Sequence, residues 1–306
     1  HEVTGGRWGL AVRAPLTAAA RLVPLTALLA IPLLIGMRML YPWVDSQEPE
    51  VLGKSWWLNP AFFAARGVIY ILIWSLLAWY WLRLAARCTT VRPPALRRFS
   101  AFGLIVYGLT VSLAAVDWIM SLLPRWYSSA FGLLIVTAQM LSAMTLAAWA
   151  CSRDEHTEAD RLQDIGNLLL TYVMTWAYVA FTQFLIIWAE DLPTEIVWYL
   201  PRVQTSWRWL TLFVFVAQFA LPFLLLLARS VKRSHRALGR LAAALLVAQL
   251  AFNIYLVLPV VRPDGIAFAW TDPVAIAALL ALWLAAWWFN FHDRGDEPAA
   301  DSRSVA

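Results

Sequence analysis

Long apolar runs that are almost free of charge alternate along this chain with short segments that are crowded with charge. The run 129–150, for example, contains no Lys, Arg, Asp or Glu. In hydrocarbon a buried charge or an unsatisfied backbone group costs several kcal/mol, so a spanning segment must satisfy its own backbone. The pattern therefore predicts an all-α fold, a polytopic transmembrane helix bundle.

A transmembrane helix needs about 20 predominantly apolar residues. Eight runs approach that length, at about 20–40, 62–84, 99–122, 129–150, 166–189, 207–229, 238–260 and 273–291. We expect an N-terminal arm (1–19), a transmembrane helical domain (20–291) and a disordered tail (292–306). The charged fraction of 14% agrees, because soluble domains carry about 25%.

The basic residues predict how the chain is oriented. Most of the 24 Lys and Arg fall in the arm, in the loops after the second, fourth and sixth spans, and in the tail. Cytoplasmic loops carry such an excess, so both termini are expected to be cytoplasmic. The opposite loops, 41–60 and 190–207, are rich in Trp and Tyr, as in an interfacial belt. Topology explains the net charge of +5, so we expect lipid and no nucleic acid as a partner.

The spans lack side chains that could hold a redox metal. The four histidines, all at a terminus or in a loop, are His1, His156, His235 and His292. Cys88 and Cys151 lie at span ends, far apart and without CxxC spacing. Haem within a membrane needs axial ligands, usually His, and iron–sulfur clusters need grouped Cys. We therefore expect no cofactor bound by this chain, and any metal centres must belong to partner subunits.

An acidic residue inside the third span is the first candidate for function. Asp117 lies near the outer end of that span, and Arg66 lies at a similar depth in the second span. An intramembrane carboxylate is a functional candidate by default. Asp117 could accept protons or contact a quinol. Alternatively, Asp117 and Arg66 form a structural ion pair between two helices.

A polar stripe along the fifth span is the second candidate. Its members, spaced by three or four residues, are Asp164, Asn167, Thr171, Thr175, Tyr178 and Thr182, and near the outer end Gln183, Glu190 and Asp191 follow. This spacing keeps the six stripe residues on one helix face, which we expect to face the bundle interior. Such a stripe could conduct protons, or it could hydrogen-bond neighbouring spans.

Four stretches carry a family resemblance: Thr-Gly-Gly-Arg-Trp-Gly (4–9), Ala-Val-Asp-Trp-Ile-Met-Ser-Leu-Leu-Pro-Arg-Trp-Tyr-Ser-Ser (115–129), Asp-Ile-Gly-Asn-Leu-Leu-Leu (164–170), and the segment 181–200, which begins Phe-Thr-Gln-Phe and contains Ala-Glu-Asp-Leu-Pro-Thr-Glu. Together they resemble the second NrfD-like membrane subunit of alternative complex III, the ActF family. That complex is a bacterial quinol:cytochrome c oxidoreductase.

The resemblance implies an NrfD-like fold of two four-helix bundles, with two further helices before residue 1, in the bacterial cytoplasmic membrane. It implies partners: a sister NrfD-like subunit, an iron–sulfur subunit, and multihaem and monohaem cytochrome c subunits. Haem c and iron–sulfur clusters would lie in those partners, with quinol or menaquinol as a possible ligand. The expected role is a proton path or a quinol-site scaffold. A secondary transporter and a purely structural membrane anchor are the alternatives.

Overall fold

The computed structural model describes residues 3, 5–6, 8–86, 94–267 and 269–292. Its long helices are α5 (Pro60–Ala86), α6 (Pro94–Trp118), α7 (Phe131–Arg153), α8 (Ala159–Glu190), α14 (His235–Val261) and α15 (Thr271–His292). One further span is continuous but built from three pieces: α11 (Arg208–Val214), the π-helical turn η3 (Phe215–Ala220) and α12 (Leu221–Leu227). The predicted tail, 292–306, lies outside the described residues except for His292.

Shorter helices connect or cap these spans. They are α1 (Trp8–Ala20), α2 (Val23–Ile35), α3 (Met37–Leu40), η1 (Pro42–Val44), α4 (Pro49–Leu52), η2 (Met120–Leu122), α9 (Pro193–Ile196), α10 (Leu200–Gln204) and α13 (Arg229–Arg233). Among the described residues there is no strand, which confirms the all-α prediction.

Within the described residues, seven helices are long and apolar enough to cross a membrane, and α1 with α2 would form an eighth span bent by 40°. The chain is thus a multi-pass membrane protein, as predicted. The first span differs from the expected 20–40, because helix α1 already occupies most of the predicted arm. A new helix starts just before Pro24, whose missing N–H is tolerated in a first turn.

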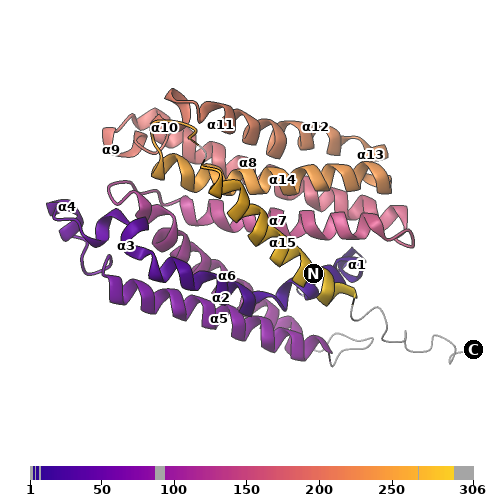
Figure 1. The fold of residues 1–306 in the computed structure, drawn as a ribbon. Coiled ribbons are helices and arrows are strands. Elements are labelled where there is room, and N and C mark those ends of the chain that lie inside the picture. Colours follow the sequence, from indigo (N-terminus) through magenta and orange to yellow (C-terminus); the bar gives the residue numbers. More distant parts are fainter. Residues whose placement is uncertain (1–2, 4, 7, 87–93, 268, 293–306) are drawn as a thin grey trace, which may run out of the picture.

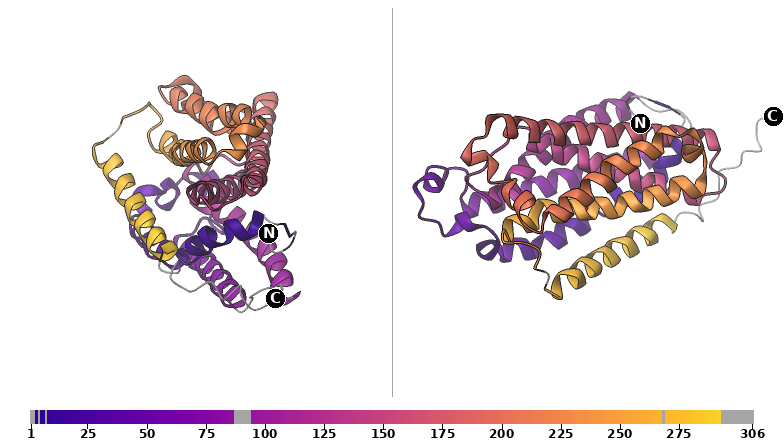
Figure 2. Two further views of the ribbon diagram at one scale, coloured as in Figure 1. Left: turned by 90° about the vertical axis from the view of Figure 1, so that its right-hand side faces the viewer. Right: turned by 90° about the horizontal axis from the view of Figure 1, so that it is seen from above.

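Helix α7 lies at the centre of the molecule (Figure 1). On one side it packs with α8, α14 and the α11–α12 span as a four-helix bundle, and on the other it packs against α6. Helices α2 and α5 complete that second group (Figure 2). Helix α15 runs across the outside, where Trp287 donates from Nε1 to the carbonyl of Pro15, 3.1 Å away.

Successive spans run in opposite directions, so the loops collect at two ends (Figure 1). Arg83, Arg153 and Arg233 lie at one end, where α5 and α7 finish and α13 leads into α14. Helices α4, α9 and α10 lie at the other end, which we call the α4–α10 end. The basic loops that follow α7 and α12 therefore lie on the same side of the bundle.

Close contact between α6 and α7 depends on Gly132. A Cβ atom at this position would lie 2.6 Å from Ser112 Cβ and 3.0 Å from Ser112 Cα. We expect Gly132→Ala to destabilise the protein by about 1–3 kcal/mol, because Ser112 cannot yield without moving the helix. Gly108→Ala is the matched control, since nothing lies within 4 Å of its added Cβ. Equal apparent melting temperatures for both variants in detergent would contradict this reasoning.

Candidate functional site

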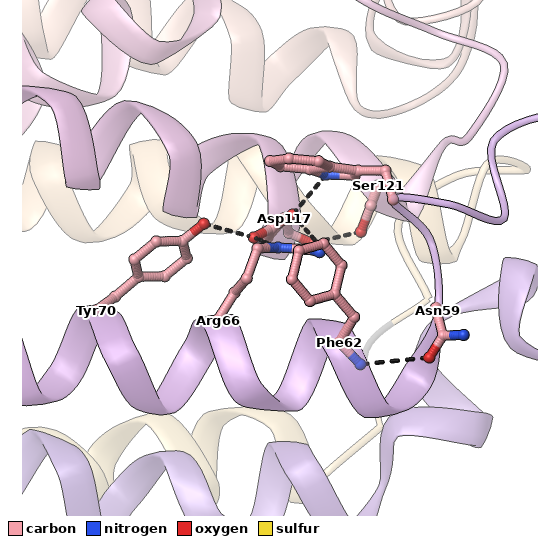
Figure 3. A network of polar contacts seen from close by, with 7 residues as sticks. Asn59, Phe62, Arg66, Tyr70, Asp117 and Ser121 are labelled. Atoms are coloured by element: carbon pink, nitrogen blue, oxygen red, sulfur yellow. Dashed lines mark hydrogen bonds and ion pairs between the residues drawn. The ribbon is translucent and has the colours of Figure 1, made fainter.

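Asp117, near the end of α6, is completely buried and accepts hydrogen bonds from three side chains (Figure 3). Arg66 on α5 binds it with both Nε and Nη2, each at 2.8 Å. The Tyr70 hydroxyl donates to Oδ2 at 2.8 Å, and Trp57 Nε1 donates to Oδ1 at 2.9 Å. The predicted pair therefore forms, and it joins α5, α6 and the loop that precedes α5.

Aromatic rings enclose the other side of this cluster. The Arg66 guanidinium lies 4.1 Å from the ring centroid of Trp57 and 4.2 Å from that of Phe62. Nearby, the Tyr41 hydroxyl donates to the carbonyl of Trp118 at 3.1 Å, and burial, helped by the charge of Asp117, raises the pKa of Tyr41. The sequence does not identify Trp57 or Tyr41 as members of this cluster, because an interfacial belt would place aromatic residues in the same loop.

The hydrogen-bond pattern of Asp117 decides between its two possible roles. A carboxylate offers about four lone-pair positions, and here four donors use them, two on each oxygen. A proton could therefore bind only if it displaced one of these donors or if the hydrogen bond with the Tyr70 hydroxyl reversed its direction. The geometry favours the structural reading, in which the ion pair locks α5 to α6.

The polar stripe of α8 does not face the bundle interior, and that expectation was wrong. Asp164, Asn167, Thr171, Thr175 and Tyr178 are all exposed. Periodicity identifies a helix face, but it cannot show which neighbour that face meets. Thr171 and Thr175 donate to the carbonyls four residues earlier, which satisfies their hydroxyls without a second helix.

The last residue of the stripe and the three polar candidates that follow it lie near the C-terminal end of α8. Thr182 is half-buried, whereas Glu190 and Asp191 are exposed. Asp191 has a φ of 48° and ends the helix in the left-handed conformation. Gln183 alone is buried, with 2% of its surface exposed. The structure thus separates the candidates: Gln183 faces inward, and most of the others face outward.

Gln183 lines a cavity of about 540 Å³ in the four-helix bundle, towards the α4–α10 end. Most of the lining is aromatic or aliphatic, and Trp176, Phe184, Phe219, Phe252 and Leu256 are representative. Trp176 and Phe252 meet edge to face with centroids 5.3 Å apart. The sequence contains no signal for this cavity, because its wall combines residues from α7, α8, α10, α11, η3 and α14.

One end of the cavity is polar. Gln183 Nε2 donates to the Tyr199 hydroxyl at 3.3 Å, but Gln183 Oε1 has no hydrogen-bond partner among the described residues. Burial raises the pKa of Tyr199, so its hydroxyl stays protonated and can donate. Gln183 and Tyr199 therefore form a polar wall beside an apolar chamber, and Gln183 Oε1 is itself buried in that wall.

Arg202 stabilises the wall behind this polar end. It is 1% exposed, and burial lowers its pKa to about 10. Its Nη2 donates to the carbonyls of Tyr255 at 3.0 Å and Leu256 at 3.1 Å. Pro259 has no N–H to pair with the Tyr255 carbonyl within α14, and Arg202 supplies the missing donor. Its guanidinium also lies 3.6 Å from the ring centroid of Trp198.

Two of the stretches that carry the family resemblance meet at this end of the molecule. Trp126, from 115–129, stacks on Trp198, from 181–200, with centroids 4.3 Å apart and planes 15° from parallel. Both rings are fully buried. Trp198 also lines the cavity, so this contact places the segment that follows α6 against the cavity wall.

No family model and no curated protein matches this chain. Within the part of the chain that the structure describes, no three His, Cys, Asp or Glu side chains group as a metal site requires. The chemistry that the described residues offer is hydrogen bonding at the edge of an apolar chamber and, between α5 and α6, a buried ion pair.

Proposed function

We propose that this chain is a membrane subunit of a quinol:cytochrome c oxidoreductase, carrying no redox metal of its own. In this proposal the redox centres, haem c and iron–sulfur clusters, belong to partner subunits. The single observation behind the proposal is the contact between Trp126 and Trp198. It brings together, in one buried region, two of the sequence stretches that resemble the ActF family.

Of the two expected roles, a scaffold for quinol fits the geometry better than a proton path. Asp117 has no free lone pair, and most of the polar stripe of α8 faces outward. The apolar cavity beside Gln183 has the composition that small-molecule sites usually have. The proposal includes the NrfD-like arrangement, the bacterial cytoplasmic membrane, and a cytoplasmic location for the basic end of the bundle.

Purification from the source membranes tests this function. The chain, tagged at its C-terminus, is extracted in a mild detergent and affinity-purified. We expect cytochrome c and iron–sulfur subunits to co-purify, with a haem c signal in the reduced-minus-oxidised spectrum and quinol-dependent reduction of cytochrome c. An unrelated multi-pass protein with the same tag is the control.

Two results would overturn the proposal. One is purification of the intact chain without redox subunits under conditions that preserve other respiratory complexes. The other is solute flux into proteoliposomes that contain only this chain, which would favour the transporter.

A further inference from the structure

We infer that a second cavity, between α1, α5 and α6, holds one acyl chain of a phospholipid whose phosphate pairs with Arg13. This cavity has a volume of about 400 Å³, and most of its lining comes from these three helices. It shares no lining residue with the cavity beside Gln183. The inference does not depend on the proposed function.

The cavity is about as deep as one leaflet of a bilayer. On α5 its lining runs from Trp74 to Trp81, and the Ala85 carbonyl, one turn further on, contacts Arg13. A helix rises by 1.5 Å per residue, so the distance from Trp74 to Ala85 is about 16 Å. The hydrocarbon core of a bilayer is about 30 Å thick, so one leaflet contributes about 15 Å. The cavity therefore extends from the end of α5 to about the middle of the membrane.

Arg13 supplies positive charge at the end of α5, where a lipid head group would lie. Its Nη2 donates to the carbonyl of Ala85 at 2.8 Å, which is its one hydrogen bond among the described residues. A guanidinium carries five N–H donors, so most of them remain unused. Arg13 is only half-buried, and none of its nitrogen atoms is enclosed without a partner. These donors can therefore reach a ligand, and their planar arrangement matches a phosphate.

The inner end of the cavity is apolar, because its polar atoms are already paired. Trp74 Nε1 donates to Thr110 Oγ1 at 2.8 Å, and the Tyr107 hydroxyl donates to Gln139. Both rings line the cavity, but they offer it hydrocarbon rather than a hydrogen bond. A ligand that fits must therefore carry its polar group at Arg13 and extend an apolar chain inwards.

The cavity is open to the membrane along its side. Leu104 lines it and is 52% exposed, and Leu77 and Phe99 are half-buried. A phospholipid could therefore place one acyl chain in the cavity and leave the other in the bilayer. Phospholipids are also the anionic amphiphiles that a bilayer supplies, and their phosphates lie at the level that Arg13 occupies. A neutral lipid such as a quinol or a diacylglycerol has no charge to pair with Arg13.

Native mass spectrometry tests the inference on the protein, purified in mild detergent with any subunits that accompany it. The probes are phosphatidylglycerol and a diacylglycerol with the same acyl chains. We expect a one-to-one phosphatidylglycerol adduct and diacylglycerol binding about tenfold weaker, because a charged hydrogen bond is lost. Arg13→Gln should abolish this difference, whereas Arg13→Lys should retain it. Arg98→Gln is the matched control, since Arg98 is exposed near the start of α6 and does not line the cavity.

A second variant tests the acyl-chain part of the site without changing Arg13. Gly103 lines the cavity, and a Cβ atom there would meet only Leu77 Cδ2, at 3.7 Å, so Gly103→Leu should fill the space where the chain lies. We expect phosphatidylglycerol to bind about tenfold more weakly. Gly108→Leu is the control, because Gly108 lies on the same helix outside the cavity, with nothing within 4 Å of an added Cβ.

Two results would overturn the inference. One is equal binding of phosphatidylglycerol and diacylglycerol by the unmodified protein. The other is phosphatidylglycerol binding that Gly103→Leu leaves unchanged relative to Gly108→Leu. The second comparison decides the question even if Arg13→Gln fails to fold, because Gly103→Leu leaves the contact between Arg13 and Ala85 intact.

Discussion

Asp117→Ala is expected to destabilise the protein by about 3–5 kcal/mol, because it breaks a buried ion pair and keeps one of the two charges. The change leaves Arg66, a residue that is only 6% exposed, without its counter-ion. It also removes the acceptor for Tyr70 and Trp57. Fluorescence-detected size-exclusion chromatography after heating in detergent gives the apparent melting temperature that measures this loss.

A second substitution separates loss of the pair from loss of a charge. The double variant Asp117→Ala with Arg66→Leu contains no unpaired charge, so we expect it to recover much of the lost stability. Asp45→Asn, in the exposed loop at the same end, should change little. The contrary result is an Asp117→Asn variant with normal stability and assembly but a large loss of quinol turnover. That outcome would restore a proton or quinol role to Asp117.

Arg202→Leu is expected to cost about 2–4 kcal/mol, because it leaves the carbonyls of Tyr255 and Leu256 without their donor. The distinctive part of this prediction is that a second substitution should restore part of the lost stability. Pro259→Ala gives α14 a backbone N–H that can reach the Tyr255 carbonyl, so Arg202→Leu should cost less when it is combined with Pro259→Ala.

A double-mutant cycle, measured as apparent melting temperatures in detergent, gives this coupling. Arg208→Leu is the control, since Arg208 is exposed and lies over Trp209. Additive effects of Arg202→Leu and Pro259→Ala would show that Arg202 does not compensate for the proline.

Most of the fold could be predicted from the sequence, because the bilayer imposes long apolar runs that are easy to recognise. The first span is harder to place. Pro24 is visible in the sequence, but whether a proline bends a span or starts a new helix depends on the helices that pack against that segment. Here α1 packs against α7 and α15, and that packing fixes it as a separate helix within the predicted arm.

The candidate site could be predicted only where charge makes it conspicuous. Asp117 and Arg66 stand out because charges are rare in spans, and matching depth is enough to expect their pairing. The direction of the α8 stripe could not be predicted, because polar residues in a membrane protein can face a partner as well as the interior. Gln183 belongs to the predicted set, but its importance comes from a cavity whose walls are distant in sequence.

The position of the Arg66–Asp117 pair has a consequence for how the protein is made. Arg66 and Asp117 lie on α5 and α6, which follow one another along the chain and run in opposite directions. A hairpin of these two helices can enter the bilayer during biosynthesis with its opposite charges already neutralised. Neither helix then has to cross hydrocarbon carrying a lone charge, so we expect α5 and α6 to enter the membrane as a single unit.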